Sequence, residues 1–247
     1  PGEPRRTAAL RLAGLAAGRA RASLDELNAA FAVESLNDEF FKLYRAHYEA
    51  FRDHLVASDA PTRLFGIAAA ELAQADVKLR DRAFKPVRDS VKKLLGRLVF
   101  LHFLQKKGWL GCPAERTDWT HGDPRFLDRL FRTAPAPDRF HSERLVPLFY
   151  ETLNRPDRAG DRLTVTGTRV PYLNGGLFER DFPGVDRVDF PGELFAGLFE
   201  FLGGYHFTID ENDPEDHEIG IDPEMLGHIF ENLLEDNKDK GAYYTPK

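Results

Sequence analysis

One apolar stretch constrains the fold of this chain more than any other. It covers residues 89–111, DSVKKLLGRLVFLHFLQKKGWLG, and its apolar side chains nearly encircle a helix of 3.6 residues per turn. A helix without a continuous polar face needs neighbours on every side, so the stretch predicts a central, buried helix. Lys106 and Lys107 fall in its last turn, and Gly108 suits the position just after it. The apolar positions are Val91, Leu94, Leu95, Leu98, Val99, Leu101, Phe103 and Leu104.

Several other stretches have the three- and four-residue apolar spacing of helices that pack against such a centre. In residues 35–55, aromatic and leucine side chains form one face, and Asn37 is expected to cap the helix. Residues 144–154 predict a short helix that begins or kinks at Pro147. Further helices are expected at residues 63–81, 123–132, 192–205 and 221–237, and near residues 5–14 and 23–31. The pattern predicts a bundle of roughly eight to ten helices with an aromatic core.

One segment departs from the helical pattern. Residues 163–178, LTVTGTRVPYLNGGLF, alternate threonine with valine and then contain turn glycines, which predicts a small β-hairpin insertion near residues 163–178. The fold class expected is therefore mainly α, a multi-helix bundle with this hairpin. The Asn174-Gly175 turn allows two interpretations, a turn near DNA or a cofactor, or a structural turn that braces the helical domain. The usual role of glycine pairs favours the brace.

Composition narrows the class of protein. The chain has 247 residues and a formal net charge of −6, so it lacks the basic excess of a typical nucleic-acid-binding domain, although a few local cations suffice for phosphate contacts. Its one cysteine, Cys112, indicates a reducing, cytoplasmic compartment and no cysteine-based metal site. The longest apolar run, residues 98–104, is too short to span a bilayer, so no membrane partner is expected.

The common catalytic motifs are absent from the sequence. It contains no phosphate-binding loop, no G-x-G-x-x-G, no G-x-S-x-G and no H-E-x-x-H. The triplet Asp76-Val77-Lys78 imitates part of a nuclease motif but is better explained as a solvated helical face. His47 and His54 suit a surface or core-edge role, and His102 suits a hydrogen-bonded core position. We therefore assign no catalytic residue and no metal ligand.

Three stretches, taken together, resemble a known family. They are KKLLGRLVFLHFLQKKGWL (residues 92–110), VPYLNGGLFE (residues 170–179) and IDPEMLGHIFENLLEDNKDKGAYYTPK (residues 221–247), in this order. They are similar to the helical connector that precedes the methyltransferase core of gamma-class adenine-specific DNA methyltransferases, including type IIG restriction–modification enzymes. The resemblance runs from about residue 36 to residue 247. In combination the stretches are specific, whereas each alone is a weak signal.

The resemblance implies a cofactor site at the end of the chain. In this family a segment like GAYYTPK lies against S-adenosylmethionine, which would make Gly241, Tyr243, Tyr244, Thr245 and Pro246 cofactor-binding residues. Their chemistry suits that role. Tyrosine rings attract a sulfonium as they attract other cations, and threonine offers a hydroxyl and an amide. Without the resemblance, tyrosines that merely pack the end of a helix would be the preferred interpretation.

The resemblance also implies a division of the chain. Residues 1–35 would be the end of a preceding domain or a linker, residues 36–220 the helical connector, and residues 221–247 the lead-in helix and first cofactor motif of a methyltransferase domain. The chain contains neither the later glycine-bearing cofactor turn nor an N-P-P-[YF] loop. We therefore expect this chain alone to be inactive and to bind S-adenosylmethionine weakly. The parent enzyme would act on double-stranded DNA together with its own methyltransferase, recognition and possible nuclease domains.

A different class of function stays open, a non-catalytic DNA-binding or partner-docking helical scaffold. Lysines and arginines on the helices expected to be exposed could contact phosphate. The acidic total charge instead favours a solvated surface of mixed charge. The cations concerned are Lys42, Arg45, Arg52, Lys92, Arg97, Lys106 and Lys107.

Overall fold

The structure is a computed structural model that describes residues 33–115, 118–173, 176–205 and 207. Within these residues the chain is mainly helical and forms no strand, only two isolated β-bridges. The α-helices are α3 (Val33–Ala57), α4 (Ala60–Phe65), α5 (Ala69–Gln74), α6 (Val77–Lys106), α7 (Phe126–Arg132) and α8 (Gly192–Gly203). Shorter 3₁₀ or π turns are η1 (Pro137–Arg139), η2 (His141–Leu145), η3 (Pro147–Leu153), η4 (Ala159–Asp161), η5 (Gly176–Phe178) and η6 (Val185–Arg187).

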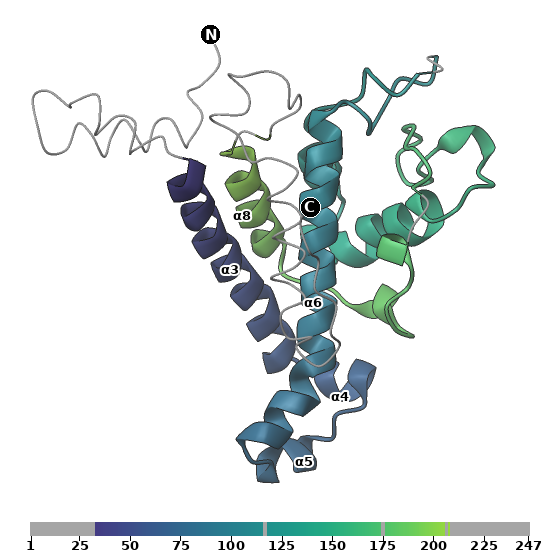
Figure 1. The fold of residues 1–247 in the computed structure, drawn as a ribbon. Coiled ribbons are helices and arrows are strands. Elements are labelled where there is room, and N and C mark those ends of the chain that lie inside the picture. Colours follow the sequence, from purple (N-terminus) through teal and green to yellow (C-terminus); the bar gives the residue numbers. More distant parts are fainter. Residues whose placement is uncertain (1–32, 116–117, 174–175, 206, 208–247) are drawn as a thin grey trace, which may run out of the picture.

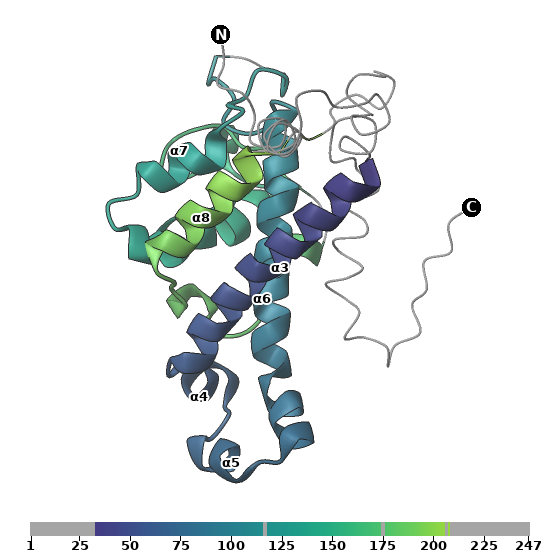
Figure 2. The ribbon, with the colours of Figure 1, turned by 90° about the vertical axis from the view of Figure 1, so that its left-hand side faces the viewer.

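Helix α6 is the centre of the molecule, as the sequence predicts. It contacts α3, α4, α7 and η5, while α3 and α7 in turn contact α8 (Figures 1 and 2). Leu95, Leu98, Val99 and Leu101 have no exposed surface. The helix ends at Lys106, and Gly108 takes the expected left-handed conformation with φ 75°. No helix of the described part of the chain is long and apolar enough to cross a membrane.

Helix α3 carries the aromatic face that its spacing predicts. Phe40, Tyr44, Phe51 and Leu55 are buried. The expected start is wrong, because α3 begins at Val33 and the proposed cap Asn37 lies inside the helix. The apolar spacing therefore located the buried face correctly, whereas the polar residues suggested too late a start.

The single helix expected over residues 63–81 is wrong. The chain forms α4, then the short α5, and starts α6 at Val77. Gly66 breaks the helix by adopting a left-handed conformation with φ 69°. Asp76 is the N-cap of α6, because its carboxylate accepts the Leu79 N–H at 2.7 Å. Asp76, Val77 and Lys78 are all exposed, so the interpretation of this triplet as a solvated helical face is confirmed.

The segment at residues 141–153 forms two π-helical turns, η2 and η3, with Pro147 at the start of the second. The Asn154 N–H bonds to the Phe149 carbonyl at 3.1 Å, a five-residue step. Val146 between the two turns keeps a helical conformation with φ −59° and ψ −52°, so the helical segment begins before Pro147 and runs on across it.

The β-hairpin insertion predicted near residues 163–178 is also wrong. The chain does reverse there, because the Leu163 N–H bonds to the Thr168 carbonyl at 2.9 Å, but only the isolated bridge Arg162↔Arg169 forms. Beyond the reversal, Pro171 has no N–H to donate to a second strand. Leu173 donates instead to the Leu153 carbonyl of η3 at 2.9 Å. The returning segment thus binds the helical domain, and no second strand forms.

Aromatic rings fill the core, as expected from the abundance of phenylalanine. Phe140 and Phe195 meet edge to face with centroids 4.9 Å apart, and Phe131 approaches Phe140 at 5.1 Å. At the other side of α8, Phe201 lies 5.0 Å from Phe40 of α3. These ring contacts fix the positions of α3, α7 and α8 around α6.

Candidate functional site

The cofactor-binding residues predicted from the resemblance are Gly241, Tyr243, Tyr244, Thr245 and Pro246, and all of them lie outside the described residues. The lead-in helix expected at residues 221–237 lies outside them too. The assignment of a cofactor strip therefore stays a prediction. Within the described ranges, a buried cluster of polar groups lies at a different place, the middle of α6.

Arg97 of α6 is the centre of this polar cluster. Its side chain is 2% exposed, and all five of its N–H donors have an acceptor. Two of them bind the Asp181 carboxylate at 2.6 and 3.1 Å. The remaining acceptors are the Leu177 carbonyl at 2.5 Å, the Glu179 carbonyl at 2.8 Å and the Tyr150 hydroxyl at 3.0 Å.

The Asp181 carboxylate is shared by three side chains. Besides Arg97 it accepts the Tyr150 hydroxyl at 3.3 Å and lies 3.1 Å from the Lys93 ammonium. The carboxylate is 8% exposed, whereas Lys93 is 57% exposed and reaches it from solvent. Burial raises the pKa of Tyr150 to about 12, so its hydroxyl keeps its proton and can donate to the carboxylate.

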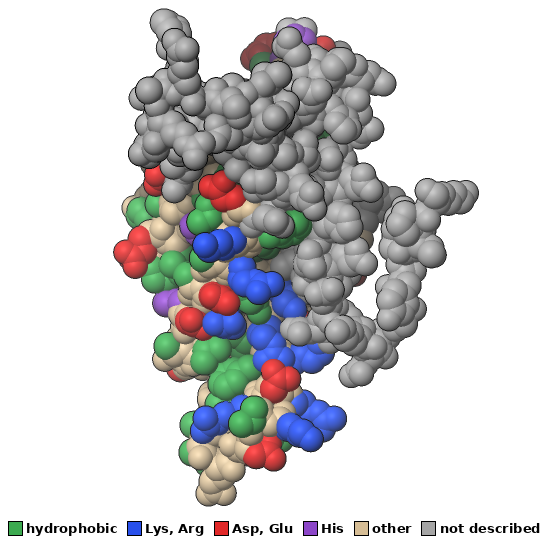
Figure 3. Space-filling view, turned by 60° about the vertical axis from the view of Figure 1, so that its left-hand side comes forward, with side chains coloured by type: hydrophobic (Ala, Val, Ile, Leu, Met, Phe, Trp, Pro, Cys, Tyr) green, Lys and Arg blue, Asp and Glu red, His purple; other side chains and the backbone are tan. Residues whose placement is uncertain are grey.

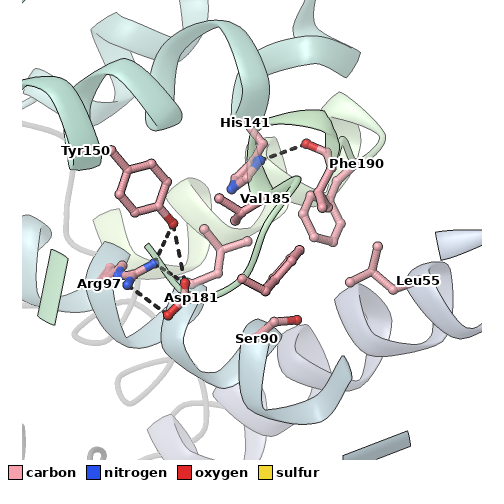
Figure 4. A pocket seen from close by; sticks show the side chains of 11 residues that line it. Leu55, Ser90, Arg97, His141, Tyr150, Asp181, Val185 and Phe190 are labelled. Carbon is pink, nitrogen blue, oxygen red and sulfur yellow. Dashed lines mark hydrogen bonds and ion pairs between the residues drawn. The ribbon is translucent and has the colours of Figure 1, made fainter. Parts of the chain in front are cut away.

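A small pocket lies beside this cluster, with a volume of about 20 Å³ (Figure 4). That is room for about one water molecule and excludes a nucleotide or S-adenosylmethionine. His141 lines the pocket, and its Nδ1–H donates to the Val188 carbonyl at 2.7 Å. Burial lowers the pKa of His141, so its ring is neutral at pH 7. Ser90, which also lines the pocket, donates its hydroxyl to the Val87 carbonyl of its own helix at 2.9 Å.

These contacts define what the cluster can do chemically. A guanidinium with five acceptors and a carboxylate with three partners are held in fixed positions and are poorly placed to exchange protons with a substrate. We name Arg97, Tyr150 and Asp181 the clasp. The clasp ties residues 177–181, which follow Asn174-Gly175-Gly176 in the sequence, to the central helix. Its geometry indicates a structural role, which is to hold residues 177–181 against α6.

A second buried polar group lies further along α6. The Gln105 side-chain oxygen accepts the Leu127 N–H at 2.9 Å, so its NH₂ group must donate to His102 Nδ1, also 2.9 Å away. This contact places the His102 proton on Nε2, which is buried and has no hydrogen-bond partner among the described residues. The hydrogen bond expected for a core histidine is therefore present at one nitrogen only. Burial lowers the pKa of His102 to about 3.

The other histidines of interest take the expected edge positions. The ring of His47 lies 5.0 Å from that of Phe201, and the ring of His54 lies 5.8 Å from that of Phe190. Across the described residues, no group of three or more His, Cys, Asp or Glu side chains could hold a metal ion.

The sequence analysis missed the clasp because it treated Arg97 and Lys92 as exposed phosphate contacts. In the structure both are buried, Arg97 at 2% and Lys92 at 9% exposure. One signal was present, since Arg97 lies between apolar neighbours in a helix predicted to be encircled by them. A buried arginine needs an acceptor, and Asp181 lies two residues after Glu179, the last residue of the second stretch. Comparison with protein-family models, curated proteins and solved structures finds no match to this chain.

Proposed function

We propose that this chain is the helical connector of an adenine-specific DNA methyltransferase. The basis of the proposal is the sequence resemblance described above. The parent enzyme would transfer a methyl group from S-adenosylmethionine to adenine N6 in double-stranded DNA, within a restriction–modification system. Residues 241–246 would form one edge of the cofactor pocket. The connector itself would carry no catalytic residue.

One structural observation supports the proposal. Two of the three stretches that carry the resemblance are far apart in sequence, and they meet in the fold. Arg97 belongs to residues 92–110, and it holds the Leu177 and Glu179 carbonyls of residues 170–179. Stretches that occur together in a family are expected to depend on one another physically. The clasp supplies such a dependence.

The clasp also suits the mechanical role of a connector. A connector transmits position between domains, so its own elements have to be held rigidly. Four charge-assisted hydrogen bonds from Arg97 fasten residues 177–181 to α6, and a fifth binds Tyr150 of η3. The sequence Asn174-Gly175-Gly176 directly precedes that segment, which supports the brace interpretation over a contact with DNA or cofactor.

The test requires the full reading frame that contains this chain. The intact protein would be expressed in a host that lacks adenine methylation, and host DNA would be digested to nucleosides and analysed by mass spectrometry. We expect N6-methyladenine. The Thr245→Ala variant is expected to lower methylation and S-adenosylmethionine affinity together, because it removes a hydroxyl from the proposed cofactor edge. The matched control Thr164→Ala alters an exposed threonine and should change neither.

Two results would overturn the proposal. One is an intact, folded protein that neither binds S-adenosylmethionine nor methylates adenine. The other is calorimetry in which this chain alone binds S-adenosylmethionine with submicromolar affinity, because the proposed pocket has only one wall here.

A further inference from the structure

Helix α6 has a charge opposite to that of the whole chain. It contains nine lysines and arginines but only two aspartates, a net charge of +7, whereas the chain carries −6. Most of this charge lies in its N-terminal half, residues 77–93, which we call the basic segment. Seven of the nine cations and both aspartates belong to the basic segment. The cations are Lys78, Arg80, Arg82, Lys85, Arg88, Lys92 and Lys93.

The start of the basic segment extends beyond the hydrophobic core. No residue of α6 before Val87 is buried, and α5 beside it has no buried residue. This end of α6 lies with α4 and α5 at one extremity of the described fold (Figures 1 and 2). On the face shown in Figure 3, lysine and arginine side chains gather along the lower half of the molecule. A partner could therefore reach Lys78, Arg80 and Arg82 directly, because all three are exposed.

Three ion pairs neutralise part of this charge, one of them the contact of Lys93 with Asp181 of the clasp at 3.1 Å. Lys85 lies 3.5 Å from Asp89, and Arg88 lies 3.0 Å from Asp81. By contrast, no carboxylate of the described residues forms an ion pair with Lys78 or Arg82, and both are exposed. With the two aspartates already paired, the basic segment keeps an excess of positive charge at its exposed end.

Helix stability does not explain this arrangement. The N-terminal end of a helix carries partial positive charge, so cations in the first turn are unfavourable there and acids are favourable. The first turn of α6 contains Lys78 and Arg80 and no acidic residue. A hydrophobic core does not explain it either, because none of the first ten residues of α6 is buried. An external anion would account for the charge.

We propose that the basic segment contacts the phosphate backbone of duplex DNA. This inference rests on the proposed function, since it names the surface through which the connector would meet the substrate of the parent enzyme. At 1.5 Å per residue, residues 77–93 span about 25 Å, which matches about seven base pairs at 3.4 Å each. Long, flexible lysine and arginine side chains along a helix of this length suit contacts with successive backbone phosphates. Such contacts do not discriminate between base sequences.

The test uses this full chain, a fluorescently labelled duplex of about 24 base pairs and fluorescence anisotropy across a series of salt concentrations. We expect binding at low salt that weakens as salt rises, alike for duplexes of different sequence. The variant Lys78→Ala/Arg82→Ala is expected to reduce the slope of log K against log salt by about 2, one for each lost phosphate contact. Alanine is the best helix former, so circular dichroism should show unchanged helix content.

The matched control is Arg125→Ala/Arg155→Ala, which removes the same charge from exposed positions outside α6. Its salt slope should equal that of the unaltered chain. A third variant, Lys42→Ala/Arg45→Ala, removes two exposed cations from α3. A slope reduced by the α3 variant and unchanged by Lys78→Ala/Arg82→Ala would move the contact to α3 and overturn the inference.

Other outcomes separate this inference from the proposed function. Absence of binding to duplex at low salt would show that the basic segment is not a DNA contact. The same conclusion would follow if polyglutamate displaced the duplex as effectively as unlabelled duplex of the same total charge. Adenine methylation by the intact protein is measured independently. Methylation together with an inert basic segment would leave the proposed function standing and remove the inference alone.

Discussion

Arg97 and Asp181 are 84 residues apart in the sequence and form a bidentate ion pair almost out of contact with solvent, at 2% and 8% exposure. The pair joins the central helix to residues 177–181. Substitution of only one member of such a buried pair is strongly destabilising, because it leaves the other charge desolvated and unpaired. The stability of the fold should therefore depend strongly on both residues together.

Asp181→Asn is the first substitution to examine. It keeps the size of the side chain but removes the charge, so the Arg97 guanidinium stays buried without its counter-ion. We expect the free energy of unfolding to fall by about 3–5 kcal/mol. Chemical denaturation followed by circular dichroism measures this change.

Lys93→Ala is the matched control for that substitution. Lys93 contacts the same carboxylate but is 57% exposed, so its loss should cost about 1 kcal/mol or less. Arg97→Met/Asp181→Leu should cost less than the sum of the two single changes, because it removes both buried charges. Equal effects of Asp181→Asn and Lys93→Ala would contradict a clasp that depends on burial.

Gly122 provides a test of close backbone packing in the loop after α6. A methyl group on Gly122 would overlap the Leu110 carbonyl oxygen and would lie 2.5 Å from that of Gly108. Both contacts are with backbone, so Gly122→Ala has to displace the loop and should cost about 1–3 kcal/mol. Gly203→Ala is the control, since nothing lies within 4 Å of a methyl group there. Thermal unfolding should show a clear loss for Gly122→Ala and none for Gly203→Ala.

The helices that the sequence predicts well are those whose signal is local. The apolar residues of α6 are sufficient to predict its burial, and the aromatic spacing of α3 is sufficient to predict its inner face. Helix interruptions are harder to predict. Gly66 and Asp76 divide residues 63–81 because one takes a left-handed conformation and the other caps α6, and apolar spacing shows neither effect.

Long-range partners set the limit of such predictions. The hairpin fails because the Leu173 N–H bonds to the Leu153 carbonyl, a partner on another element. The clasp was missed for the same reason, since a helical pattern shows that Arg97 has apolar neighbours but not that Asp181 is near. The predicted cofactor edge at residues 241–246 depends on the resemblance and stays a prediction.

Acid should destabilise the fold through its buried histidines. The pKa of His102 is lowered from 6.5 to about 3 by burial and by nearby Lys106, and burial also lowers that of His141. Between pH 6.5 and pH 3 the unfolded chain binds a proton at His102 that the folded chain does not. The stability contributed by neutral His102 is therefore present above pH 6.5 and is lost as the pH falls. Between pH 7.5 and pH 5 this loss is about 2 kcal/mol.

The variant His102→Leu isolates that contribution. Its free energy of unfolding should change less between pH 7.5 and pH 5 than that of the unaltered chain, by about 2 kcal/mol. His121→Leu, which alters an exposed histidine, is the comparison variant for loss of an imidazole outside the core. An acid-induced loss that is identical in the His102→Leu variant would show that His102 is protonated in the folded state.

Helix α6 should not open as one unit. Residues 77–86 contribute no buried side chain, whereas residues 91–105 are almost entirely buried. Pro86 lies inside the helix and has no N–H to donate to the Arg82 carbonyl, so the exposed end lacks one helical hydrogen bond. In hydrogen exchange followed by mass spectrometry, we expect residues 77–86 to exchange much earlier than residues 91–105.

Pro86→Ala tests the cause of this difference, because it restores the missing donor and a good helix former together. It should slow exchange over residues 77–85 while exchange over residues 91–105 stays the same. Lys85→Ala changes the neighbouring side chain without restoring a backbone hydrogen bond, and it should not slow exchange. Equal protection from exchange along the whole of α6 in the unaltered chain would contradict the prediction that residues 77–86 open independently of the core. It would imply that the basic segment is stabilised by a contact beyond those described.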